Sequence, residues 1–156
     1  MSDDADDHDW RDIRAVALAV VTRETADGEE LLVFELRDDD ADETFYRPPG
    51  GGVHFGEAAA DAAEREFEEE LGVAATATER LAVLENRFTF EREAGHEYDF
   101  VYRVEPADGD LYTREELTGT ETDGSEYRVT WQSLAELRAE RSPPLYPEGL
   151  VAVLSE

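Results

Sequence analysis

Three glutamates, Glu66, Glu69 and Glu70, lie in a stretch rich in Ala and Glu, from about 57 to 71, that favours an α-helix ending at Gly72. At 100° per residue, the three side chains fall on one stripe roughly 100° wide. Carboxylates at these spacings repel one another. A hard divalent cation would relieve the repulsion, because Mg²⁺, or Mn²⁺ as an alternative, binds oxygen ligands. The stripe therefore predicts a metal site.

A hydrated cation held by a few carboxylates suits hydrolysis at phosphorus, because it activates a water molecule and neutralises phosphoryl oxygens. The glycines at 50–52 precede the helix, and their small size lets a backbone amide or carbonyl approach the same ion. A cation would also bridge an anionic protein to an anionic substrate. The chemistry that this pattern indicates is metal-assisted cleavage of a phosphate compound.

The composition narrows the classes of protein. The chain has 156 residues, with 41 acidic residues against 14 basic ones, all Arg, and a net charge of −27. This charge argues against unaided binding of nucleic acid and fits adaptation to a salty, halophilic cytoplasm, where ions screen self-repulsion. No apolar run is long enough to span a membrane, and the absence of Cys excludes disulfides and thiolate zinc sites. We expect a cytoplasmic protein.

The elements that must position the glutamates follow from periodicity and turn residues. An acidic flexible tail is expected at 1–11 and a single domain at 12–156. A turn at 26–29 predicts a hairpin between the first two strands, and 38–43, 45–52 and 111–125 are expected to be irregular. This order predicts an α+β fold, with strands at 14–22, 31–37, 81–91, 98–104 and 127–131 and helices at 57–71, 133–141 and 147–154.

Seven residues with characteristic spacing surround the glutamate stripe: Gly51, Glu57, Arg65, Glu66, Glu69, Glu70 and Gly72. This pattern resembles the Nudix box of MutT-like hydrolases, which act on nucleoside diphosphates linked to another moiety. Phe67 departs from it, since the family prefers Leu, Ile or Val there. Weaker similarity extends over roughly 12–154.

The resemblance implies an α/β/α sandwich with a central mixed β-sheet and a Mg²⁺-dependent pyrophosphohydrolase that uses a small nucleotide-type substrate. It also implies roles for individual residues. The implied metal ligands are Glu66, Glu69, Glu70 and the carbonyl of Gly51; Glu57 and Arg65 would brace the loop and orient the ligands, and Glu69 would polarise the attacking water.

Other residues are candidates for substrate contacts or for the general base. Arg47 is able to meet a substrate phosphate bidentately, although an ion pair with a neighbouring acid is the alternative. Glu97, beside His96, is a second candidate for substrate binding. Family members differ in which acid acts as the base, so Glu97, Glu115 and Glu116 stay open beside Glu69.

Marks of known substrate subfamilies are missing downstream and upstream of the box. The substrate therefore stays open among ADP-ribose, a nucleoside triphosphate, a sugar nucleotide and related compounds. Two alternatives to an enzyme remain: a catalytically idle Nudix-fold domain that senses a nucleotide or binds a partner, and an acidic protein that mimics nucleic acid. A homodimer is also left open. No membrane partner is expected.

Overall fold

The computed structural model describes residues 12–121 and 123–155, so the predicted tail at 1–11 lies outside the described residues. Its elements, in chain order, are β1 (Arg14–Val20), β2 (Thr22–Thr25), β3 (Gly28–Asp38), β4 (Glu43–Arg47), β5 (Gly50–Gly52), α1 (Ala59–Leu71), β6 (Ala75–Phe90), β7 (Glu93–Pro106), the 3₁₀ helix η2 (Gly109–Thr113), β8 (Glu116–Thr120), β9 (Glu126–Ser133), α2 (Leu134–Arg138) and α3 (Leu150–Leu154).

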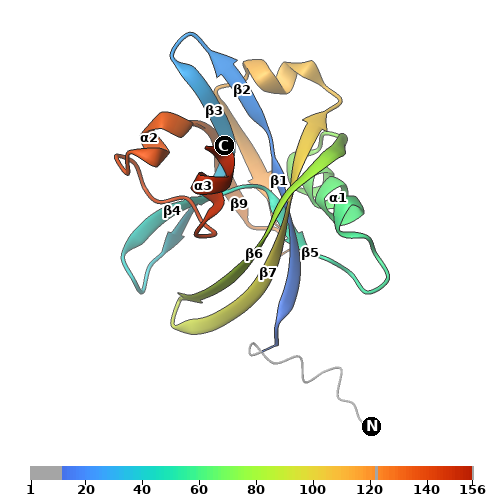
Figure 1. Cartoon of the computed structure of the whole chain (residues 1–156), viewed down its shortest axis with the longest axis vertical. Helices are drawn as coiled ribbons and strands as arrows, with labels where there is room; N and C mark the ends of the chain where they lie inside the picture. Colours follow the sequence, from blue (N-terminus) through green and yellow to red (C-terminus); the bar gives the residue numbers. More distant parts are fainter. Residues whose placement is uncertain (1–11, 122, 156) are drawn as a thin grey trace.

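The strands form two sheets between helices (Figure 1). One sheet has the order β5-β1-β7-β6 and is mixed, because β1 runs parallel to β7 and antiparallel to β5. The other, β2-β3-β9-β8 with β4 paired to β3, is antiparallel. Helix α1 lies on one side of this β-structure, and α2 and α3 lie on the other (Figure 1). The expected α+β fold is confirmed.

Strand β1 is buried on both faces, which explains its continuous apolar sequence. Ala17 and Ala19 point into the core that contains Phe67 of α1. Val16 and Leu18, which alternate with them, point into the second core, beneath α2 and α3. The same alternation holds along β3. The side chains that β1 and β3 direct toward the first core thus form the surface on which α1 packs.

The predicted hairpin occurs, but its first strand is β2 and not β1. Residues 22–25 of β2 pair with 28–31 of β3, so the turn at 26–29 is where the sequence placed it. Of the first strand, predicted at 14–22, only the end pairs with the second strand, through Thr22 opposite Leu31, whereas β1 pairs with β5 and β7. A strand that is apolar on both faces is stabilised most at the centre of a sheet, away from an edge hairpin.

Three segments that were expected to be irregular contain strands. Residues 43–47 form β4, 50–52 form β5 and 116–120 form β8. The glycine strand β5 is held by pairing with β1, where a Cβ on Gly50 would lie 2.2 Å from the carbonyl oxygen of Ala17. Local propensity predicts a loop there, and tertiary pairing overrides it.

The predicted helices are present and shorter than expected. Helix α1 begins at Ala59, α2 ends at Arg138 and α3 begins at Leu150. Within the described residues, no helix is both long enough and apolar enough to cross a membrane.

Candidate active site

Helix α1 carries the glutamate stripe along its flank. Phe67 is fully buried and anchors the helix on the sheet, and Gly72 ends it in the left-handed conformation, with a φ of 72°. Glu66 and Glu70 are buried with this anchored face, whereas the side chain of Glu69 is 56% exposed. The three acids share a flank, as predicted, but two face the protein and one faces solvent.

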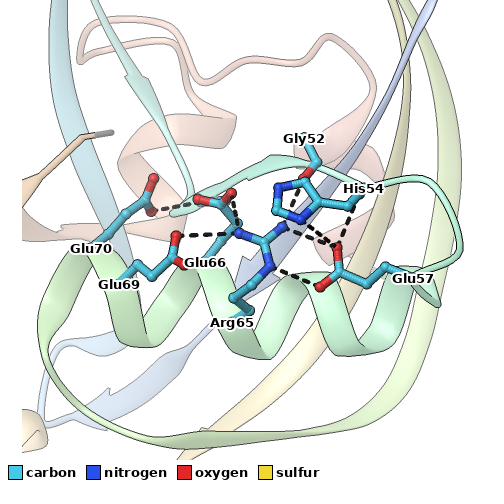
Figure 2. Close-up of polar contacts among 8 residues, drawn as sticks. Gly52, His54, Glu57, Arg65, Glu66, Glu69 and Glu70 are labelled. Atoms are coloured by element: carbon cyan, nitrogen blue, oxygen red, sulfur yellow. Dashed lines mark hydrogen bonds and ion pairs between the residues drawn. The ribbon is translucent and has the colours of Figure 1, made fainter. Parts of the chain in front are cut away.

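The guanidinium of Arg65 lies at the centre of the site (Figure 2). Its Nε donates to Oε2 of Glu57 at 2.8 Å, and Nη2 donates to the carbonyl oxygen of Gly52 at 2.9 Å. Nη1 donates to Oε2 of Glu66 at 3.0 Å and to Oε1 of Glu69 at 3.2 Å. The long side chain of Arg65 thus joins the preceding loop to two acids of the stripe.

Glu57 fastens the loop that precedes α1. Its Oε1 accepts from the backbone N–H of His54 at 3.0 Å and from Nη2 of Arg65 at 3.1 Å. The hydrogen bonds from Arg65, followed by that from His54, lower the pKa of Glu57 to about 2. Glu57 is therefore ionised in any working buffer and acts as a brace.

The low pKa of Glu57 predicts a pH-dependent contribution to stability. Because the folded-state pKa of about 2 lies below the ordinary 4.5, this stabilisation is full above pH 4.5 and is lost as pH falls toward 2. Thermal melting of the parent and of Glu57→Gln should therefore differ most near neutral pH and converge in acid. The matched control is Glu68→Gln, on the exposed side of α1. A difference that does not change with pH would contradict this role.

Glu70 is the most unusual acid of the stripe. Its Oε1 accepts from the backbone N–H of Gly50 at 3.0 Å, whereas its Oε2 is buried and has no hydrogen-bond partner among the described residues. Burial, and then the charge of Glu121, raise the pKa of Glu70 to about 9, although Arg47 acts in the opposite direction. Glu70 therefore carries a proton at neutral pH unless a cation takes that proton's place.

The donor set around the stripe suits a hard cation. A Cβ on Gly51 would lie 2.5 Å from Cδ of Glu66, so the glycine backbone touches that carboxylate where no side chain fits. With the free Oε2 of Glu70, the site offers carboxylate and carbonyl oxygens only, the ligands that Mg²⁺ and Mn²⁺ prefer.

Within residues 12–121 and 123–155, no three acidic or histidine side chains converge closely enough to hold an ion as they stand. The hydrogen bonds explain why: Arg65 holds Glu66 and Glu69, and the N–H of Gly50 holds Glu70. Coordination by all three acids would require the exposed Glu69 to turn away from Arg65. The chemistry of the residues fits a divalent cation, and rotation of side chains would complete the site.

A cavity of about 690 Å³ is lined by parts of β4, β6 and β7, by Glu121 and Asp123, and by residues 146–148. Glu121 relates this cavity to the stripe, because its charge helps to raise the pKa of Glu70. The two residues predicted to bind substrate, Arg47 and Glu97, both line it. Arg47 donates from Nη2 to Glu121 at 3.0 Å, while its buried Nε has no partner among the described residues. Glu97 faces Arg14, with 3.6 Å between Oε2 and Nη1.

Two acids in this region were missed by the sequence analysis. Glu121 pairs with Arg47, and burial together with the charge of Glu66 raises its pKa even though Arg47 lowers it. Asp99 is 1% exposed, and burial followed by the neighbouring Glu97 raises its pKa, although Arg47 and Asn86 act in the opposite direction. Asp99 could have been singled out from the sequence, because it is the acid in the strand predicted at 98–104, where every other residue except Arg103 is apolar or aromatic. Nothing in the sequence distinguishes Glu121, because acidic loops occur throughout the chain.

The later acids proposed as alternative bases lie in ion pairs elsewhere. Glu115 is 3.2 Å from Nη2 of Arg23, and Glu116 pairs with Arg128 on the antiparallel sheet. Nε2 of His96, beside Glu97, lies 2.9 Å from Oε2 of Glu85 on the neighbouring strand β6.

Comparison with known proteins places this geometry in context. A family model described as NUDIX domain matches residues 12–149. A MutT NUDIX hydrolase from Burkholderia pseudomallei is 22% identical, with a TM-score of 0.59, and the alignment covers 92% of this chain and 98% of that one.

Two further solved structures are similar. A NUDIX-family hydrolase from Clostridium perfringens is 14% identical with a TM-score of 0.60, over 91% of this chain and 94% of that one. An ADP-ribose pyrophosphatase from Streptococcus suis is 20% identical with a TM-score of 0.50, over 91% and 87%. At these identities the likeness concerns the fold. No curated protein matches the chain.

Proposed function

Because the chain belongs to the NUDIX domain family, we propose that it hydrolyses a phosphoanhydride bond in a small nucleotide derivative with the help of a divalent cation. Water attacks phosphorus, and the leaving group is a phosphate or a nucleotide. The main support is Glu70, a buried acid beside Glu66 with one oxygen that lacks a partner among the described residues.

The cation would be held by Glu66, Glu69, Glu70 and the carbonyl oxygen of Gly51, and Mg²⁺ fits this oxygen donor set, with Mn²⁺ as the alternative. When bound, it supplies a Lewis acid that neutralises phosphoryl oxygens and acidifies a water molecule.

The protein's own residues would orient the metal ligands, deprotonate the attacking water and bind the substrate phosphate. Arg65 and Glu57 hold the loop at 52–57 against α1, because the guanidinium of Arg65 donates both to Glu57 and to the carbonyl oxygen of Gly52. Glu69 is the candidate for accepting the proton of the attacking water, since its half-exposed carboxylate is the most accessible of the three. The unpaired Nε of Arg47 is suited to a substrate phosphate.

The test is a hydrolysis assay on a panel of ADP-ribose, nucleoside triphosphates and sugar nucleotides, in high salt, with products resolved by chromatography. We expect nucleotide products with Mg²⁺, loss of turnover in EDTA and recovery when excess Mg²⁺ is added. Turnover that EDTA leaves undiminished would overturn the proposed role of the cation.

The same panel addresses the alternative of a catalytically idle domain. Tight, saturable binding of a nucleotide without product would favour a nucleotide sensor. The complete set of box acids favours the enzyme, since Glu57, Glu66, Glu69 and Glu70 are all retained.

A further inference from the structure

Four large apolar side chains are exposed in the described part of the chain, and all four lie in or beside the mixed sheet. Val83 is on β6 and Tyr98 is on the neighbouring strand β7. Ile13 directly precedes β1, and Phe55 follows β5. Exposed apolar residues that occur singly are ordinary, whereas a contiguous group of them marks an interaction surface.

The alternation along β1 shows which face of the sheet carries this group. Ala17 and Ala19 contribute to the core that contains Phe67 of α1. Side chains alternate along a strand, so Ala15 points to this same face, and Ile13 continues the alternation. Ala17 and Ala19 are fully buried and Ala15 is exposed, so α1 covers one end of the face and leaves the other open.

The strand registers extend the open end across two more strands. Tyr98 lies opposite Ala15 of β1, and Phe100, two residues further along β7, lies opposite Val83 of β6. Residues directly opposite one another share a face of the sheet. We call this surface the apolar face, and its residues are Ile13, Ala15, Val83, Tyr98 and Phe100.

Phe55 connects the apolar face to the candidate active site. The backbone N–H of Val53 donates to the carbonyl oxygen of Ala15 at 2.9 Å, so the loop that leads to α1 leaves the sheet beside this face. Phe55 is fully exposed in that loop, two residues before Glu57, whose carboxylate accepts from Arg65. A partner that covers Phe55 would therefore contact the loop that Glu57 and Arg65 hold.

The charge of the apolar face differs from that of the whole chain. The charged residues that follow Val83 on β6 are Glu85 and Arg87, which cancel, whereas the chain has a net charge of −27. Glu85 is also within hydrogen-bond distance of Nε2 of His96 and of the hydroxyl of Tyr98. Two copies of so acidic a protein repel one another over most of their surfaces, and a neutral apolar face is where they approach at the least cost. A basic partner would be attracted to the acidic surfaces instead.

We propose that the apolar face, together with Phe55, binds the same face of a second copy of this chain in a two-fold dimer. A two-fold axis sets the face against itself, so apolar side chains meet apolar side chains, and each substitution in the face occurs twice in the interface. The second copy also covers the loop before α1.

Sedimentation velocity on the full chain tests the proposal without any substrate or metal. From about 1 μM to about 1 mM protein in high salt, the parent should pass from monomer to dimer. Raising the salt concentration should strengthen the association, because ions screen the repulsion between two chains of charge −27. An interface made of ion pairs would weaken instead, and that result would contradict an apolar interface.

A matched pair of substitutions locates the interface. Ala15→Glu puts an acid into the apolar face, and Ala152→Glu adds the same charge at an exposed position of α3, on the other side of the β-structure (Figure 1). Ala15→Glu should raise the dissociation constant at least about tenfold, because like charges meet across the axis. Ala152→Glu should leave it unchanged. Val83→Glu should act as Ala15→Glu does, and circular dichroism identifies a variant that fails to fold, in which case the other variant decides.

Hydrogen exchange locates the contact independently of the variants. Dilution of the parent from dimer to monomer should speed amide exchange at 53–56 and at the start of β1, and leave exchange in α3 unchanged. A parent that stays monomeric, a dimer that survives both Ala15→Glu and Val83→Glu, or equal weakening by Ala152→Glu would overturn the inference. A monomeric parent that binds phosphatidylcholine vesicles through these residues would overturn it as well. All of these outcomes leave the proposed hydrolysis untouched.

Discussion

Replacing Glu70 by Gln is expected to lower kcat/KM at least about 100-fold, because even residues that only support metal ligands cost about 10–100-fold when they are changed. Thermal stability should stay close to that of the parent. Burial raises the pKa of Glu70 to about 9, so in the metal-free protein the group is already neutral, and Gln has nearly the same shape. Its carbonyl still accepts from the N–H of Gly50.

The assay for Glu70→Gln combines steady-state hydrolysis with thermal melting in the presence and absence of Mg²⁺. A bound ion stabilises the folded state, so added Mg²⁺ should raise the melting temperature of the parent and have much less effect on the variant. Glu68→Gln, on the exposed side of the same helix, should behave as the parent in both measurements. Parental turnover by Glu70→Gln would contradict the assignment of Glu70 as a ligand.

Replacing Arg65 by Ala is expected to reduce both stability and turnover. The change removes the donors to Glu57 and Glu66, whose side chains are 18% and 9% exposed, and to the carbonyl oxygen of Gly52. Breaking such a pair by removing one partner is strongly destabilising, and partial exposure reduces the effect, so we expect a loss of about 2 kcal/mol in the free energy of unfolding. The loop before α1 would also lose its main tie to the helix.

Arg65→Lys makes the prediction sharper. A lysine keeps the charge but lacks the planar fork that reaches Glu57, Glu66 and Gly52 together. In urea denaturation, we expect the unfolding free energy of Arg65→Lys to lie between those of the parent and of Arg65→Ala. Its turnover should still be strongly reduced. Arg141→Ala removes an exposed ion pair with Glu136 and should change the unfolding free energy little. Equal stability of Arg65→Ala and the parent would show that the network is dispensable.

Much of the fold was predictable because its signals are local. The continuous apolar run in β1 indicated a strand buried on both faces, and Ala and Glu followed by Gly72 indicated α1. β4, β5 and β8 were not predicted, because their sequences favour loops and only pairing with distant strands holds them. The partner of β1 was also wrong, since strand pairing depends on the whole sheet.

In the candidate site, too, some properties follow from the local sequence and others do not. The spacing along one helix determined that Glu66, Glu69 and Glu70 share a flank, and the fixed residues around them determined the family. These properties depend on residues that lie close together in the chain, between Gly51 and Gly72, so the sequence by itself contains them.

Only the tertiary structure decided which acids are buried, which oxygens lack donors and which groups meet across the cavity. Burial raises the pKa of Glu70, Glu121 comes close to it from a distant part of the chain, and Asp99 is buried beside Glu97 of its own strand and Asn86 of the next. The physical reason is that burial and the local electrostatic field are set by neighbours far apart in the chain, which residue types and spacing do not specify.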